Sequence, residues 1–168
     1  FDTEIDGSVN ITTSKRQPGS SFKPVVYASA FARGLNPANY IFDVPIKLGE
    51  NIPKNFDGEF MGPISVKTAL SQSRNIPAIK AYYVGGEQEE IIGLTEKLGI
   101  RSLDRRSDYG WPLALGTGEL QMLELAQAYS VFANKGSKVA VNPILKITDR
   151  QGEVLEDYTE SEFKGVQV

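Results

Sequence analysis

The sequence predicts an α+β domain that is rich in helices. Apolar side chains recur at helical spacing in two long segments, 87–98 and 119–135. Near the end of the chain, 139–147 and 153–158 are predicted as strands of a hairpin, joined by a turn at Asp149-Arg150-Gln151-Gly152. The 168 residues, 40% hydrophobic and 23% charged, suit one globular domain with a core of its own.

The first predicted helix starts after Pro18-Gly19, which breaks the preceding segment, and ends at Gly34. Ser20 lies at or near its N-cap, and Pro24 fits its first turn, where a missing amide costs little. The residues that follow at near-helical spacing are Phe22, Val25, Val26, Ser29, Ala30 and Phe31.

Ser20 and Lys23 are the first candidate site residues. The chain has no histidine, so a Ser-His-Asp arrangement cannot be built from it, and a lysine is the natural base for a serine nucleophile. On a helix, side chains three residues apart lie about 5–6 Å apart, and the free amides of the first turn can stabilise an oxyanion. Alternatively, Ser20 only caps the helix and Lys23 is solvated. Ser161-Glu162-Phe163-Lys164 has the same spacing in an acidic tail and is interpreted as a chance match.

The second candidate constellation is Ser73-Arg74-Asn75, at the junction of two short predicted helices. Ser65 is expected to cap a helix over 66–72, and Asn75 to cap one over 76–84. Asn75 is then an ordinary cap, or else Ser73 relays protons in a cleft and Asn75 holds a substrate carbonyl. The tripeptide alone means little, because Ser8-Val9-Asn10 repeats its pattern.

The remaining segments are assigned by composition and spacing. The proline-rich stretch 35–62 is predicted as a long connection with little regular structure, and 101–109 as a second loop. Trp111-Pro112 either packs or lines a cleft, and packing is the more common role of a tryptophan. The core face expected for the helix over 119–135 consists of Met122, Leu125, Ala126, Tyr129, Phe132 and Ala133.

Composition excludes several classes of protein. The formal charge of −3 gives no reason to expect nucleic acid as a partner. No apolar run approaches the roughly 18–20 residues of a membrane span, and no signal peptide is evident. The absence of cysteine is compatible with an extracytoplasmic location.

Three blocks together resemble the transpeptidase domain of the bifunctional class A penicillin-binding proteins. They are 16–24, which contains Ser20 and Lys23, 62–78, which contains Ser73-Arg74-Asn75, and 113–136. The resemblance implies a penicillin-binding-protein or serine β-lactamase-like α+β fold, with a helical cluster against an antiparallel sheet. It spans most of the chain in the order of the family.

The resemblance also implies roles for four residues. Ser20 would be the acylated nucleophile, Lys23 its general base, Ser73 a proton shuttle and Asn75 a substrate-binding amide. The reaction would cross-link peptidoglycan stem peptides through an acyl-enzyme, which β-lactam antibiotics also form. No metal or organic cofactor is expected. Arg74 stands where β-lactamases have aspartate, which favours a transpeptidase, and no glutamate matches the deacylating base of a class A lactamase.

The third motif of the family, Lys-Thr/Ser-Gly, is absent from the chain. Residues 1–168 are therefore expected to be a partial transpeptidase domain, incomplete at the C-terminus, whose missing C-terminal segment would be its partner. Such a piece is expected to be weak or inactive alone. By resemblance, the whole protein would act at the extracytoplasmic face of the bacterial membrane, with its anchor outside this chain.

Two other functions remain open at this point. A serine β-lactamase or a penicillin sensor would share the serine-lysine site and differ in how fast the acyl-enzyme hydrolyses. A catalytically inactive penicillin-binding-like scaffold would keep the fold and lose acylation.

Overall fold

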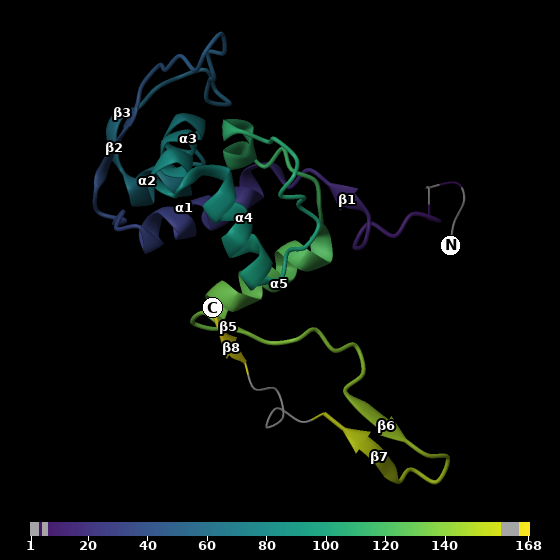
Figure 1. Ribbon diagram of the computed structural model, residues 1–168. Coiled ribbons are helices and arrows are strands. Elements are labelled where there is room, and N and C mark those ends of the chain that lie inside the picture. Colours follow the sequence, from purple (N-terminus) through teal and green to yellow (C-terminus); the bar gives the residue numbers. More distant parts are fainter. Residues whose placement is uncertain (1–3, 5–6, 159–164) are drawn as a thin grey trace.

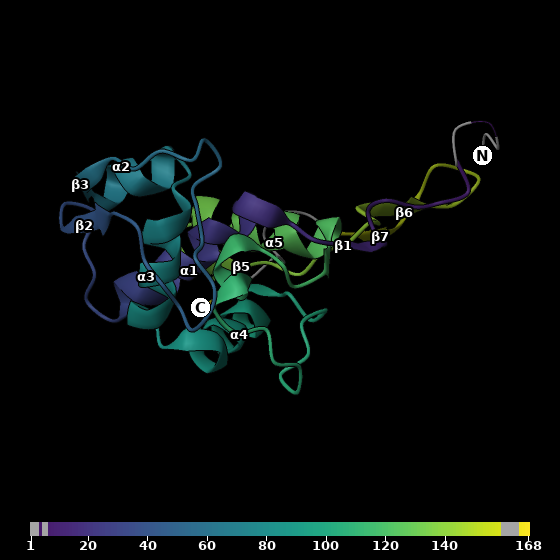
Figure 2. The same ribbon diagram turned by 90° about the horizontal axis from the view of Figure 1, so that it is seen from above.

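Three α-helices pack around α3 (Asn75–Val84), namely α1 (Lys23–Ala32), α2 (Val66–Ser71) and α4 (Glu87–Leu98). The computed structural model describes residues 4, 7–158 and 165–168. Figure 1 shows the helices gathered in one body, from which the C-terminal hairpin extends, and Figure 2 shows the same separation from above. The α+β class predicted from the sequence is confirmed.

The described strands form four separate antiparallel pairs, so they do not join into one sheet. The pairs are β1 (Lys15–Arg16) with β4 (Leu120–Gln121), β2 (Tyr40–Asp43) with β3 (Gly62–Ser65), β5 (Ser137–Lys138) with β8 (Val166–Gln167), and β6 (Lys146–Thr148) with β7 (Val154–Asp157). The remaining elements are the 3-10 helices η2 (Gly19–Phe22) and η3 (Trp111–Leu115) and the helix α5 (Met122–Ala133).

The core lies between α1, α3 and α4. α3 buries residues on every side, among them Ile76, Ile79 and Tyr82, because other elements surround it. Val25, Val26 and Ala30 of α1 are fully buried beside it. Each large apolar side chain buried in this way contributes about 1.5–3 kcal/mol, so α1 and α3 give a well-packed support to a site at their N-terminal ends.

Several local predictions are confirmed. α4 has the predicted bounds, and Gly99, at φ 106°, ends it. Ser65 caps α2 through a bond that its hydroxyl accepts from the amide of Thr68. The C-terminal hairpin is present as β6 and β7, although its first strand is shorter than predicted. Trp111 packs partly buried against the core, in agreement with a packing role.

The stretch 35–62 is more ordered than predicted, because β2 lies within it and pairs with β3. The register joins Tyr40 to Ser65 and Asp43 to Gly62. About twenty residues separate the partners in the chain, so no local sequence pattern predicts the pairing. β2 matters to the site because it ends at Asp43, a fully buried carboxylate.

The core face predicted for the helix over 119–135 is wrong. α5 begins at Met122, after strand β4, and its buried residues are Ala128 and Val131. Leu125 is partly buried, whereas five of the predicted core residues are exposed: Met122, Ala126, Tyr129, Phe132 and Ala133. α5 packs on α4, β4 and β5 with its other side. The apolar stripe is real, but among the described residues no element covers it.

The second serine-lysine pair singled out in the sequence, Ser161 and Lys164, lies outside the described residues. Over the part of the chain that the structure describes, no helix combines the length and apolarity needed to cross a lipid bilayer.

Candidate active site

Ser20 lies exposed in the 3-10 turn η2, which leads directly into α1. It is thus not the N-cap of the α-helix, which starts at Lys23. Backbone contacts hold the turn: the amide of Gly19 donates to the carbonyl of Gly116 over 3.2 Å, and the Tyr129 hydroxyl donates to the carbonyl of Ser21 over 2.8 Å. A Cβ on Gly116 would lie 2.1 Å from the Gly19 oxygen, so only glycine allows this approach.

Lys23 is buried, with 1% of its surface exposed, so it is not a solvated lysine. Its Nζ contacts three oxygens: the Ser73 carbonyl at 2.5 Å, the Asn75 Oδ1 at 2.7 Å and the Ser73 Oγ at 3.1 Å. Burial, and secondarily the positive charge of Arg74, lower the pKa of Lys23 from 10.5 to about 8. The sequence had suggested a bond from Lys23 to Ser20. Among the hydrogen bonds of the described residues there is none between them, because the three oxygens above occupy the ammonium.

Ser20, Ser73 and Asn75 nevertheless line one cavity of about 380 Å³. The structure therefore brings the two sequence motifs together, with the Lys23 amine bound to the second of them. The other residues that line the cavity are Asn55, Phe56, Asp57, Gln72 and Arg74.

Ser73 adopts a backbone conformation that favours glycine, at φ 54°. α2 ends in a Schellman motif, in which the amide of Ser73 donates to the carbonyl of Leu70 and that of Arg74 to the carbonyl of Ala69. The residue at this position is usually glycine, and a serine there costs about 1–2 kcal/mol. The strain coincides with the only hydroxyl that Lys23 contacts in the described structure.

Asn75 is the first residue of α3 rather than its cap, so the helix begins one residue earlier than predicted. The cap is supplied from another part of the chain, because Asn55 Oδ1 accepts from the amides of Asn75 at 2.7 Å and Ile76 at 3.4 Å. The Asn75 side chain is thereby free to bridge two other groups. Its Oδ1 accepts from Lys23, and its Nδ2 donates to the Lys54 carbonyl over 2.9 Å.

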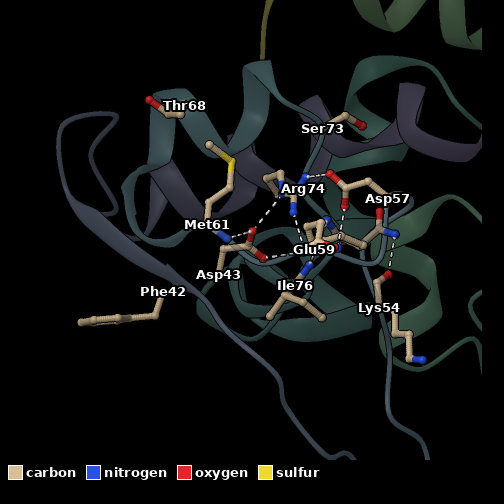
Figure 3. Close-up of polar contacts among 12 residues, drawn as sticks. Phe42, Asp43, Lys54, Asp57, Glu59, Met61, Thr68, Ser73, Arg74 and Ile76 are labelled. Carbon is tan, nitrogen blue, oxygen red and sulfur yellow. Dashed lines mark hydrogen bonds and ion pairs between the residues drawn. The ribbon is translucent and has the colours of Figure 1, made fainter.

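Arg74 is buried and ion-paired, as Figure 3 shows, with Asp43 and Asp57 in contact with its guanidinium. Its Nε lies 2.8 Å from Asp43 Oδ2, its Nη1 lies 2.6 Å from Asp57 Oδ2, and its Nη2 donates to the Glu59 carbonyl. The hydrogen bond from Arg74 lowers the pKa of Asp57, whose side chain is half exposed. This positive group sits between Ser73 and Asn75, so it keeps the junction in place and repels a proton from Lys23.

Sequence reasoning missed Asp43, Asn55 and Asp57, all of which lie in the stretch interpreted as an irregular connection. The one available signal was Arg74, because a guanidinium placed between two candidate site residues requires carboxylate partners once it is buried. Within the described residues, no three His, Cys, Asp or Glu side chains gather as metal ligands.

Comparisons with known proteins give matches over most of the chain. A family model described as the penicillin binding protein transpeptidase domain matches residues 7–167. Penicillin-binding protein 1A of Neisseria meningitidis serogroup A is 41% identical over 147 residues, which cover 82% of this chain and 18% of that relative. The crystal structure of penicillin-binding protein 1A from Haemophilus influenzae matches with a TM-score of 0.79 at 33% identity, over 90% of this chain and 23% of that one.

A more distant structure supports the fold alone. It is the PonA1 protein from Mycobacterium tuberculosis in complex with penicillin V, with a TM-score of 0.77 at 21% identity, over 90% of this chain and 43% of that one. The two solved structures each match over 90% of this chain, and the curated relative is several times longer than the matched region.

Proposed function

This chain belongs to the penicillin-binding protein transpeptidase family, and from that premise we propose that it carries the acyl-transfer site of a peptidoglycan D,D-transpeptidase. The observation that carries the proposal is the buried Lys23 amine, bound to Ser73 and Asn75 beneath a cavity that Ser20 also lines. In this proposal Ser20 is the nucleophile, Lys23 the base, Ser73 the proton shuttle and Asn75 the substrate-binding amide.

The hydrogen bonds of Lys23 suit a base that changes its protonation state. Two of its partners, the Ser73 carbonyl and Asn75 Oδ1, can only accept, so they always require a proton from Nζ. The Ser73 hydroxyl can either accept from the ammonium or donate to the neutral amine. With a pKa of about 8, roughly a tenth of Lys23 is neutral at pH 7, so Ser73 is the group through which the proton enters and leaves.

The proposed reaction has two halves. The Ser20 oxygen attacks the penultimate D-Ala carbonyl of a stem peptide, and its proton passes to Lys23. The amide bond breaks as Ser73 delivers a proton to the departing D-Ala amine and takes a proton back from Lys23. The resulting Ser20 ester is attacked by an amine of a neighbouring strand, which restores the serine hydroxyl. A β-lactam opens on the same serine, but its leaving amine stays attached. The whole protein would act on the extracytoplasmic side of the bacterial membrane.

Mass spectrometry of the intact protein with penicillin tests the proposal. The protein at its full natural length should gain one penicillin per chain, and peptide mapping should locate it on Ser20. Ser20→Ala should abolish the adduct, whereas Ser161→Ala, which alters the other serine with a lysine three residues on, should leave it unchanged. An adduct that survives Ser20→Ala would overturn the assignment. Release of many equivalents of hydrolysed drug would identify a β-lactamase, and an intact fold without an adduct would identify a scaffold.

The pH dependence of acylation tests the role of Lys23. Because the neutral amine is the base, the rate constant of acylation should rise about tenfold per pH unit below pH 8 and level off above it. Stopped-flow measurements with a coloured cephalosporin between pH 6 and 9.5 provide the profile. A rate that is independent of pH through this range would exclude Lys23 as the base.

A further inference from the structure

We propose that Asn55 is a positioning residue of this site, which holds Asn75, and through it Lys23, in the arrangement that acylation requires. The inference rests on the proposed function, because the arrangement matters only if Lys23 and Asn75 take part in the reaction. It adds to the site a residue from the connection between β2 and β3.

The Asn55 side chain is buried and fully bonded. It is 5% exposed, its Nδ2 donates to Asp43 Oδ1 over 2.7 Å and to the Glu59 carbonyl over 2.8 Å, and its Oδ1 accepts from the amides of Asn75 and Ile76. Only a carboxamide offers two donors and an acceptor in this planar shape. Aspartate would keep the acceptor and lose both donors, and an apolar residue would lose all of these bonds.

The segment Lys54-Asn55 holds Asn75 at two points. Asn55 Oδ1 binds its main-chain amide, and the Lys54 carbonyl binds its side-chain Nδ2. Since a carbonyl can only accept, the second bond places the Asn75 nitrogen on the Lys54 side and leaves Oδ1 facing Lys23. The orientation of the Asn75 amide, and hence one of the bonds to the Lys23 amine, therefore depends on where Lys54-Asn55 lies.

Buried charges in turn anchor Asn55. Its two acceptors, Asp43 and the Glu59 carbonyl, are also partners of Arg74, the residue between Ser73 and Asn75. Asp43 is fully buried between the guanidinium and the amide. β2, the turn at 54–59 and the junction of α2 with α3 are thus joined by one network with Asn55 at its centre. The charged groups of this network are Arg74, Asp43 and the half-exposed Asp57.

A double-mutant cycle separates positioning from a merely structural role. In the protein at its full natural length, Asn55→Ala should lower the rate constant of acylation by penicillin about 10- to 100-fold, with the non-covalent affinity changed much less. If Asn55 acts through Asn75, then adding Asn55→Ala to Asn75→Ala should lower the rate little further. Losses that multiply, or an unchanged rate in the single variant, would overturn the inference.

Two further variants protect the test against misfolding. Asn39→Ala is the matched control, because Asn39 Oδ1 also caps a backbone amide, that of Asn36, in an exposed turn, and its loss should leave the rate unchanged. Asn55→Asp keeps the shape and the cap of α3 but places an oxygen, in place of the two donors, against Asp43 and the Glu59 carbonyl. It should acylate more slowly, and denaturant unfolding must show that the variant is folded under the conditions of the acylation assay. If Asn55→Asp acylates at the normal rate, the network anchored on Asp43 has no positioning role.

A second readout does not depend on acylation. NMR titration of Lys23 in a Ser20→Ala background should show a lower pKa when Asn55→Ala is added, because Asn75 Oδ1 no longer stays in place to accept from the ammonium. The shift should vanish in the Asn75→Ala background. A Lys23 pKa that does not respond to Asn55→Ala contradicts the inference, whereas a wild-type protein that takes no penicillin contradicts only the proposed function.

Discussion

The turn that carries Ser20 is held by backbone contacts, whereas the junction that carries Ser73 and Asn75 is held by buried side chains. Gly116 and Tyr129 bind main-chain atoms of the turn. At the junction, by contrast, the side chains of Arg74 and Asn55 both donate hydrogen bonds to the buried carboxylate of Asp43. Close backbone contacts tolerate changes of charge and pH but are disrupted by added volume. A network of charged side chains is instead disrupted by the loss of a charge. Lys23 belongs to both regions, since it follows the turn and contacts the junction.

Removal of a buried charge at the junction should have the largest effect. Asp43→Ala leaves the Arg74 guanidinium without its fully buried partner, which should lower the free energy of unfolding by about 3–5 kcal/mol. Asp57→Ala removes a half-exposed partner of the same arginine and should cost far less. Denaturant unfolding of both variants measures the difference. If the two variants lose equal free energy of unfolding, the burial of Asp43 does not strengthen its ion pair. The junction would then not depend on buried charge, as its contrast with the turn requires.

Lys23 should make stability depend on pH. Its pKa in the folded protein is about 8, below the 10.5 of an ordinary lysine, so between these values the unfolded chain binds more protons. Stability should therefore rise as pH increases from about 8, and the full effect up to pH 10.5 is on the order of 3 kcal/mol. Well below pH 8, where both states are protonated, Lys23 contributes no slope.

The measurement is chemical denaturation from pH 7 to 10, compared with the Lys23→Met variant. Burial and the charge of Asp43 raise the pKa of Tyr27, which would lower stability above its ordinary pKa of 10, so the range stops there. The wild-type protein should gain stability with pH relative to Lys23→Met. Parallel curves for the two proteins would show that Lys23 is not held in the buried, bonded state described above.

The turn should respond to volume. Gly116→Ala would bring a methyl group within 2.1 Å of the Gly19 oxygen and also strain a backbone at φ 75°, at a combined cost of about 2–3 kcal/mol. Gly49→Ala is the control, because Gly49 has a similar φ of 60° and open space around its Cβ position, and strain alone should cost about 1 kcal/mol. Thermal unfolding gives both values, and acylation of Ser20 should be impaired only by Gly116→Ala.

The same distinction explains what the sequence could predict. α4 has local signals at both ends, acidic residues in its first turn and Lys97 with Gly99 at its end, so its bounds were predictable. The apolar stripe of α5 was equally visible, but which side of a helix finds a partner depends on the other elements, and Tyr129 and Phe132 are exposed. β2 was missed because its partner, β3, is distant in the chain.

The site divides in the same manner. Ser20, Lys23, Ser73 and Asn75 occur in short motifs, so they could be chosen from the sequence, and the structure places them around one cavity or in contact with its walls. Asp43 and Asn55 lie in no motif. Their positions follow from the pairing of β2 with β3 and from the burial of Arg74, which are properties of the folded chain. The Lys23 amine likewise bonds to Ser73 rather than Ser20, because the fold brings next to it acceptors that lie far away in the sequence.

The smallest effect expected on stability concerns the strained serine at the junction. Ser73→Gly relieves the unfavourable φ of 54° and should stabilise the fold by up to about 1 kcal/mol, although it removes the hydroxyl bonded to Lys23 and should lower acylation by more than tenfold. Lys135→Gly is the matched control, because Lys135 has a φ of 53° just after α5, and it should stabilise the protein without a loss of acylation. Thermal unfolding and penicillin labelling on both variants measure the two effects. If Ser73→Gly destabilises the protein as well, the hydroxyl supports the fold more than the reaction, and the strain at this position would have no functional cause.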